Sequence, residues 1–262
     1  MRCEGCGAEN VSGVSFCRMC GLRLAPSPPP PSPPPARAGQ ATSLVPALHG
    51  GFRLTLLNAD GSPKIIHQVQ SERVDIGRTE GDLLVDDPQL AARHARIVTN
   101  GAHRVLVPVD NRNGVYIRLR APRELGDGDY FLVGKQVLQL EVVSAAERGV
   151  VPGFEHGVLF FGTPWRPPWG RLRQLTAAGV ARDVYHLARA ETVLGREKAD
   201  VVFSDDESMS RQHARISLRE GHVVIEDLGS SNGTFVRLYG PHRLSSGDVL
   251  RAGDQVFRFE GG

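Results

Sequence analysis

The chain has 262 residues, of which 40 % are hydrophobic, so its length allows two domains with packed cores. Its 31 basic and 29 acidic residues give a formal net charge of +2, which provides no reason to expect binding to nucleic acid or to a membrane surface. No apolar run approaches the ~20 residues of a membrane span, and the first residues lack the apolar core of a secretion signal, so we expect a cytoplasmic protein whose cysteines stay reduced.

Residues 1–24 contain all four cysteines, arranged as two Cys-x2-Cys pairs: Cys3, Cys6, Cys17 and Cys20. This is the spacing of a tetrahedral zinc site, and the segment resembles the small zinc-ribbon family of bacterial proteins. A segment this short cannot bury enough apolar surface to fold alone, so we expect one structural Zn²⁺ to stabilise it. Two disulfides or a redox dithiol are the alternatives. A structural or protein-docking role fits better than nucleic-acid binding, because the segment has few basic residues.

Residues 25–50 form a proline-rich linker. Between Pro26 and Pro35, eight of ten residues are proline, which favours an extended polyproline II rod. The rest of the segment, residues 36–50, is small and polar without periodicity, and is expected to be flexible.

Short apolar runs then follow one another from 51 to 143, and again from 169 to 262. In the first stretch the runs are Leu54 to Leu57, Ile65-Ile66, Val74 to Ile76, Leu83 to Val85, Ile97-Val98, Val105 to Val107, Val115 to Ile117 and Val137 to Val143. Turn dipeptides such as Asn100-Gly101 separate them, a pattern typical of an all-β sandwich. Residues 144–168 are expected to be an inter-domain linker, whose aromatic end at Trp165 to Trp169 would pack against one sandwich.

The two β-rich stretches are copies of each other. The aligned segments are Gln89 to Ile97 with Ser208 to Ile216, His94 to Asn113 with His213 to Asn232, Gly77-Arg78 with Gly195-Arg196, and Gly128-Asp129 with Gly247-Asp248. We call residues 51–143 the first repeat and residues 169–262 the second repeat, and we expect each to be one sandwich.

The second repeat contains three blocks in order, Gly195-Arg196, Ser210-Arg211-Gln212-His213 and Ser230-Ser231-Asn232-Gly233-Thr234. In this all-β context they resemble the forkhead-associated (FHA) domain family, which recognises phosphothreonine peptides. Phosphothreonine has close to two negative charges and three acceptor oxygens, and a guanidinium can bind it with paired N–H donors.

The resemblance implies a role for each residue of the motif. Arg196 and Ser210 would bind the phosphate, and Arg211 would add a donor to the phosphate or the peptide backbone. Ser231 would touch the phosphate or the threonine backbone, and Asn232 the neighbouring peptide main chain. In the family Gly195, His213 and Gly233 are structural, with the histidine bracing two loops.

Some of these residues have simpler interpretations. Asn232-Gly233 makes a good hairpin turn in any β protein, and Arg196 or Ser210 could be ordinary surface residues. The acidic run Asp205-Asp206-Glu207 lies just before Ser210. If it faces the site, it would repel an anion or set the preference for residues flanking the phosphothreonine.

The first repeat keeps Arg78, His94 and Asn113, but has Ala91 and Ala92 in place of Ser210 and Arg211, and Arg112 in place of Ser231. Lost hydrogen bonds to a charged group typically cost ~1.5–3 kcal/mol each. We therefore expect a degenerate FHA fold that serves as a scaffold or makes a phosphate-independent contact. The alternative is an altered anion site made by Arg78, Arg112 and Asn113.

These features indicate a non-enzymatic signalling adaptor that docks on threonine-phosphorylated proteins, with a Ser/Thr kinase or its substrate as the partner. The alternative is a zinc-ribbon regulator of transcription or nucleic-acid processing that FHA contacts switch. The sequence contains no phosphate-binding Walker A loop, no nucleophile elbow and no His-Glu-x-x-His zinc motif, so we expect no catalytic activity.

Overall fold

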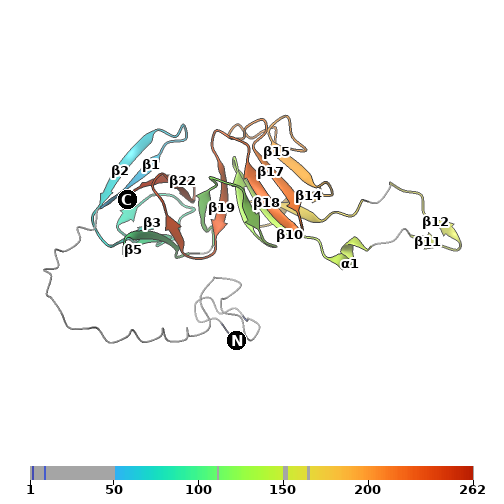
Figure 1. The fold of residues 1–262 in the computed structure, drawn as a ribbon, viewed down its shortest axis with the longest axis horizontal. Coiled ribbons are helices and arrows are strands. Elements are labelled where there is room, and N and C mark those ends of the chain that lie inside the picture. The colour runs from blue at the N-terminus through green and yellow to red at the C-terminus, as the bar shows by residue number, and fades with distance from the viewer. Residues whose placement is uncertain are drawn as a thin grey trace, which may run out of the picture. The chain divides into compact units, whose positions relative to one another are not determined.

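The computed structural model describes residues 51–110, 112–149, 153–163 and 166–261, together with Arg2 and Glu9, which form an isolated antiparallel bridge. The four cysteines and the proline-rich linker lie outside the described residues. Within the described part the protein is almost entirely β, as Figure 1 shows. This confirms the expected all-β class.

The strands match the apolar runs of the sequence. Those of the first repeat are β1 (Phe52–Leu57), β2 (Pro63–Val69), β3 (Arg73–Gly77), β4 (Leu83–Leu84), β5 (Ala95–Asn100), β6 (His103–Pro108), β7 (Val115–Arg118), β8 (Arg123–Leu125), β9 (Tyr130–Val133) and β10 (Gln136–Val142). Those of the second repeat are β13 (Gly170–Leu175), β14 (Ala181–Leu187), β15 (Glu191–Gly195), β16 (Val201–Val202), β17 (Ala214–Arg219), β18 (His222–Asp227), β19 (Thr234–Leu238), β20 (His242–Leu244), β21 (Val249–Ala252) and β22 (Gln255–Glu260).

The segment between the repeats has some regular structure of its own. It contains the one-turn helix α1 (Ala145–Arg148), which Ser144 caps, and the short hairpin of β11 (Phe154–Glu155) and β12 (Val158–Leu159). Trp169 at its end is buried, and its indole N–H donates to the carbonyl of Arg189 at 2.7 Å. The expected packing of this aromatic end is therefore found at Trp169, whereas Trp165 lies outside the described residues.

The chain forms two compact units whose limits differ from those of the repeats. Among the described residues, unit 1 consists of those within 1–115, 238–248 and 252–262, and unit 2 of those within 116–237 and 249–251. The chain crosses from one unit to the other within β7, β19 and β21. Each unit thus combines the first half of one repeat with the second half of the other, which we call the exchange of halves.

In unit 1, strand β1 lies between β2 of its own repeat and β22 of the second repeat, both antiparallel to it. A second sheet has the order β20-β6-β5-β3-β4, so the second repeat also supplies its edge strand β20. The core includes fully buried Leu54, Ile76 and Phe257, and the rings of Phe52 and Phe259 lie 5.4 Å apart. The aromatic pair therefore joins the two repeats inside one core.

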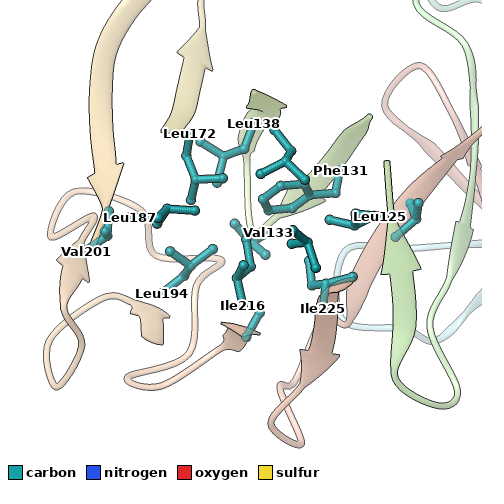
Figure 2. Close-up of a cluster of buried hydrophobic side chains, with 14 of the residues drawn as sticks. Leu125, Phe131, Val133, Leu138, Leu172, Leu187, Leu194, Val201, Ile216 and Ile225 are labelled. Carbon is teal, nitrogen blue, oxygen red and sulfur yellow. The ribbon is translucent and has the colours of Figure 1, made fainter. Parts of the chain in front are cut away.

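Unit 2 is built in the same way. One sheet runs in the order β14-β13-β10-β9-β19, and the other in the order β16-β15-β17-β18-β8. Strand β10 of the first repeat pairs with β13 of the second, from Val137↔Leu175 to Val142↔Gly170. Figure 2 shows the core, in which Phe131 and Leu138 from the first repeat meet Leu194 and Ile216 from the second.

The exchange of halves differs from the expectation that each repeat is one sandwich. Both repeats have the same alternation of buried and exposed residues, so the second half of either copy can complete the sheets of the other. The backbone ladder is compatible with either partner, as in domain swapping, and the structure has the exchanged one. Sequence periodicity therefore predicts the strands but cannot predict which copy completes which sandwich.

Candidate functional site

The first site loop begins where strand β15 ends at Gly195. A Cβ at this position would collide with the carbonyl oxygen of Arg211, so only glycine allows the two loops to approach so closely. The next residue, Arg196, donates its backbone N–H to the carbonyl of Ser210 at 3.0 Å. The side chain of Arg196 stays 33 % exposed, so it projects toward solvent from a backbone that is fixed on both sides.

The second site loop, which contains Ser210, and the third site loop, which contains Ser231 and Asn232, are joined through side chains. The Oγ of Ser210 accepts the backbone N–H of Ser231 at 3.1 Å, and the side-chain amide of Asn232 donates to the carbonyl of Ser208 at 2.8 Å. Ser231 and Asn232 are exposed and Ser210 is half-buried. The structure thus brings together the expected site residues from all three blocks at one end of unit 2.

His213 lies beneath these loops and is completely buried. Its Nδ1 accepts the backbone N–H of Ser210 at 3.1 Å, so the ring proton is on Nε2, which donates to the carbonyl of Gly233 at 3.1 Å. Burial lowers the pKa of His213 below its ordinary value, so the imidazole is neutral near pH 7. Both ring nitrogens are used to hold loop backbone, which leaves none for acid–base chemistry.

The two arginines of the site converge on one carboxylate. An Nη of Arg196 and the Nε of Arg211 each lie 3.4 Å from an oxygen of Glu197. Glu197 is about half exposed, and Arg211 is 66 % exposed. Two guanidiniums that can reach a single carboxylate can also reach a single phosphate, for which Glu197 would have to move aside.

The acidic run before Ser210 is not directed as one group toward the site. Asp206 is buried, and its carboxylate accepts the backbone N–H of Ser208 at 2.9 Å and that of Lys135 at 2.7 Å. Asp205 and Glu207 are exposed. Asp206 therefore anchors the β9–β10 turn that the first repeat contributes to unit 2, which removes the strongest argument against an anion site.

The third loop has an organiser that sequence reasoning missed. Asp227, at the end of β18, accepts the hydroxyls of Ser230 at 2.6 Å and Thr234 at 2.7 Å, as well as the backbone N–H of Gly229 at 3.0 Å. Burial raises the pKa of Asp227, but the hydrogen bonds from Ser230 and Thr234 outweigh it and the net pKa is lowered. An aspartate followed within a few residues by glycine, serine and threonine was the available sequence signal.

Arg118 of the first repeat also reaches the third loop. Gly233 has φ +84°, and a Cβ built on it would collide with the guanidinium of Arg118. Gly233 is therefore required both for the backbone conformation and for the approach of this side chain. A further cation thus lies next to Asn232, and it comes from the other copy of the sequence.

The corresponding loops of unit 1 have the same frame. The Nδ1 of His94 accepts the N–H of Ala91 at 3.2 Å, and its Nε2 donates to the carbonyl of Gly114 at 2.9 Å. The side-chain amide of Asn113 donates to the carbonyl of Gln89 at 2.7 Å, as Asn232 does to Ser208. The residues that shape the loops thus act alike in both units.

The donors that face solvent differ. Ala91 has no hydroxyl, and Arg112 is bound by its neighbour Asp110, with an Nη to carboxylate distance of 2.7 Å. Arg78 is exposed, and no ion pair joins it to any residue that the structure describes. Of the three residues expected for an altered anion site, Arg112 is therefore paired within the protein, whereas Asn113 makes the same loop contact as Asn232.

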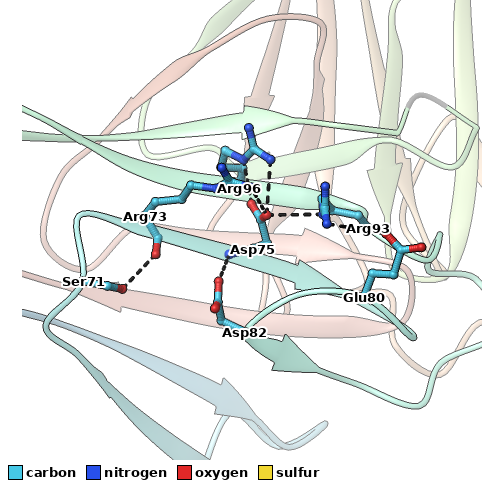
Figure 3. Close-up of polar contacts among 7 residues, drawn as sticks. All are labelled: Ser71, Arg73, Asp75, Glu80, Asp82, Arg93 and Arg96. Atoms are coloured by element: carbon cyan, nitrogen blue, oxygen red, sulfur yellow. Dashed lines mark hydrogen bonds and ion pairs between the residues drawn. The ribbon is translucent and has the colours of Figure 1, made fainter.

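A second carboxylate in unit 1 attracts three more arginines, as Figure 3 shows. Buried Asp75 lies 2.6 Å from Arg96, 2.6 Å from Arg73 and 3.3 Å from Arg93. The hydrogen bond from Arg96, with that from Arg73, lowers the pKa of Asp75 to about 2 although burial opposes it. The matching position in unit 2 is Val193, so this cluster belongs to unit 1 alone.

Comparison with known proteins agrees with this geometry. Residues 74–134 and 192–253 each match the family model described as FHA domain. The chain belongs to the FHA domain family. Domains of this family bind phosphothreonine, and the two matched regions include the three site loops of each unit.

Curated relatives include regulators. The chain is 29 % identical over 127 residues to the oxoglutarate dehydrogenase inhibitor of Corynebacterium diphtheriae, which covers 47 % of this chain and 86 % of that protein. It is also 29 % identical over 120 residues to the glycogen accumulation regulator GarA of Mycobacterium tuberculosis, covering 46 % and 70 %. By their names these two relatives are an inhibitor and a regulator.

Among solved structures, an FHA domain from Chlamydia trachomatis is 32 % identical and covers 35 % of this chain and 96 % of that chain, with a TM-score of 0.22. Mycobacterium tuberculosis EmbR in complex with a low-affinity phosphopeptide is 31 % identical, and the match covers 33 % of this chain and 26 % of that chain, with a TM-score of 0.20.

No helix among the described residues is long and apolar enough to cross a membrane.

Proposed function

We propose that this protein is a non-catalytic adaptor whose unit 2 binds threonine-phosphorylated proteins. The observation that carries the proposal is the convergence of Arg196 and Arg211 on the one carboxylate of Glu197, beside the half-buried Ser210. A phosphate at this position would receive charge-assisted hydrogen bonds from both guanidiniums. Ser210 Oγ and the exposed Ser231 and Asn232 are available for the remaining phosphate oxygen and the peptide main chain.

Unit 1 has the frame but not the donors, so we propose that it does not bind phosphothreonine. Ala91 and Ala92 remove two donors, and Glu80 occupies the position at which unit 2 has Lys198. Arg112 is neutralised by Asp110. These differences support the degenerate alternative over the altered anion site.

The test uses the whole chain, because unit 2 includes strands from both repeats. Titration calorimetry with a phosphothreonine peptide and its unphosphorylated form should give binding only to the phosphorylated one. Arg196→Ala should weaken binding by about 100-fold or more, since it removes a charge-assisted contact. The matched control is Arg78→Ala at the same position of the first repeat, which should change nothing. Equal loss in both variants, or binding of the unphosphorylated peptide, would contradict the assignment.

The source of the phosphorylated partner follows from its chemistry. Phosphothreonine is made by Ser/Thr kinases, so we propose that such a kinase or one of its substrates is the partner. Regulators among the relatives support this placement in signalling. A pull-down with phosphoproteins, before and after phosphatase treatment, tests this proposal. The original protein should retain the partner only before the treatment, and Arg196→Ala should not retain it.

We also propose that Cys3, Cys6, Cys17 and Cys20 hold one structural Zn²⁺, which rests on their spacing alone. Elemental analysis of metal-replete protein should find about one zinc per chain. A Cys17→Ser/Cys20→Ser variant should lose it, while phosphopeptide binding by unit 2 should be unchanged. Zinc content well below one per chain would contradict this proposal without affecting the phosphopeptide site.

A further inference from the structure

Arg118 is an arginine of the first repeat that lies beside the phosphopeptide site proposed for unit 2. It is the last residue of strand β7, and the backbone N–H of the next residue, Leu119, donates to the carbonyl of Thr234 at 2.8 Å. On its other side Ile117 is buried. The backbone of Arg118 is therefore held against the residue that follows Gly233 in the third site loop.

The guanidinium of Arg118 lies against the backbone of Gly233, where a Cβ would collide with its Nε and Cζ. The side chain is half-buried, and no hydrogen bond or ion pair joins it to any residue that the structure describes. The carboxylate of Asp227, which organises this loop, already accepts the hydroxyls of Ser230 and Thr234. Arg118 is thus a cation without a counter-charge among the described residues. Because partial burial lowers the local dielectric, its attraction for an anion is stronger than that of a fully exposed arginine.

The second repeat provides an internal comparison. Arg237 stands at the position that matches Arg118, and its guanidinium carbon lies 5.1 Å from the centre of the Tyr130 ring. The residue that matches Tyr130 in the second repeat is Val249, which has no aromatic ring to offer Arg118. The arginine of one copy therefore has an aromatic partner within the protein, and that of the other copy is left for a ligand.

The exchange of halves brings Arg118 to this loop, since unit 2 begins within β7 and ends within β19. At the phosphate end of the loop, the backbone N–H of Ser231 is bound to Ser210. Gly233 is two residues further along the chain, which is at most about 7 Å. An extended peptide advances about 3.3 Å per residue. Arg118 is therefore within reach of a peptide side chain two or three positions from the phosphothreonine.

We propose that Arg118 selects phosphopeptides that have an aspartate or glutamate two or three residues from the phosphothreonine. The inference rests on the proposed function of unit 2 and names the class of peptide that it would prefer. A carboxylate at this position would supply the missing counter-charge and could accept paired N–H donors from the guanidinium. An amide would lack the charge, and a lysine or arginine of the peptide would be repelled.

Titration calorimetry on the full chain tests this with pairs of phosphothreonine peptides. The two peptides of a pair differ only by aspartate or asparagine, placed two or three residues to either side of the phosphothreonine. At one of these positions the aspartate form should bind about three- to fivefold more tightly, and the difference should shrink at high salt. Arg118→Gln should abolish the difference and leave the affinity for the asparagine form unchanged. Arg118→Lys, which keeps the charge but not the paired donors, should retain part of it.

The control is Arg148→Gln, which makes the same change in net charge at an exposed position of α1 and should keep the full preference. An unchanged melting temperature would verify that Arg118→Gln leaves the fold intact. Equal loss of affinity for both peptides of a pair would show that Arg118 only supports the third site loop, and would overturn the proposal.

An aspartate preference that persists in Arg118→Gln, or none in the original protein, would also overturn it. In all these cases phosphothreonine peptides still bind, so the proposed function of unit 2 would stand. If no phosphothreonine peptide binds the original protein, both proposals are wrong.

Discussion

In unit 1 the imidazole of His94 joins Ala91 to Gly114, and in unit 2 that of His213 joins Ser210 to Gly233. The same brace thus supports two loops that present different chemistry. Unit 2 directs Arg196 and Arg211 toward the half-exposed carboxylate of Glu197. In unit 1 the arginines beside Asp75 and Asp110 pair with those carboxylates, and Arg78, at the position of Arg196, stays exposed. The histidine contacts that shape the loops are thus the same in both units, whereas the donors at Ser210 and Arg211 are replaced by Ala91 and Ala92.

After Arg196→Ala, the largest effect on this contrast is expected from Ser210→Ala, which gives unit 2 the residue of unit 1. The change removes a donor to phosphate and the acceptor that holds the Ser231 N–H. Phosphothreonine peptide affinity, measured by calorimetry on the full chain, should fall by about 10- to 100-fold. Ser204→Ala, at an exposed serine outside the three loops, should have no effect. An affinity within about twofold of the original would show that Ser210 does not contact phosphate.

The converse change, Asp75→Val, gives unit 1 the residue found in unit 2. The change removes the carboxylate that three arginines share. The pKa of Asp75 is about 2 in the folded protein, against an ordinary value of 3.8, and this difference corresponds to about 2 kcal/mol of stability near neutral pH. Amide hydrogen exchange of β3 and β5 should therefore accelerate, while that of β15 and β17 should not. Asp86→Asn, at an exposed carboxylate of the same unit, is the control.

The pH dependence of this contribution has a definite sign. Between pH 3.8 and about 2 the unfolded state binds more protons than the folded state, so the stability from Asp75 is present above pH 3.8 and is lost as the pH falls toward 2. The Asp75→Val protein should therefore lose less stability in unit 1 than the original protein does as the pH falls from 3.8 toward 2. Identical acid profiles for the two proteins would rule out Asp75 as its source.

The smallest effect is expected from Glu197→Gln. Its carboxylate lies 3.4 Å from both Arg196 and Arg211 and competes with phosphate for them. Exposed ion pairs contribute roughly 0.2–1 kcal/mol, so the variant should bind phosphopeptide about two- to fivefold more tightly. Glu207→Gln makes the same change in net charge at another exposed position and should give a smaller gain. Weaker binding by Glu197→Gln would mean that its carboxylate helps to orient the arginines.

Much of this contrast could be predicted from the sequence. Turn glycines and apolar runs predict the strands, and the sequence blocks around Arg196, Ser210 and Asn232 predict the loops. Each of these signals is local in the chain. The residues that bind Asp227 are also close to it in the sequence. The first repeat lacks this aspartate, because Pro108 stands at the matching position. The placement of Arg118 beside Gly233 was not predictable, because it depends on which copy supplies the strands, and the two copies share one pattern.

The exchange of halves also sets the order in which the protein can be completed during synthesis. Every residue of the three loops of unit 2, and all of residues 116–237, have been translated before the last strands of the chain exist. Unit 1 begins earlier but stays open until β22 arrives to pair with β1, a contact between Arg53 and Glu260 that spans 207 residues. Contacts that distant in sequence form slowly, so the N-terminal half-sandwich has an unpaired edge strand β1 throughout translation. A premature stop near the C-terminus would therefore damage unit 1, at the beginning of the chain, and leave most of unit 2 intact.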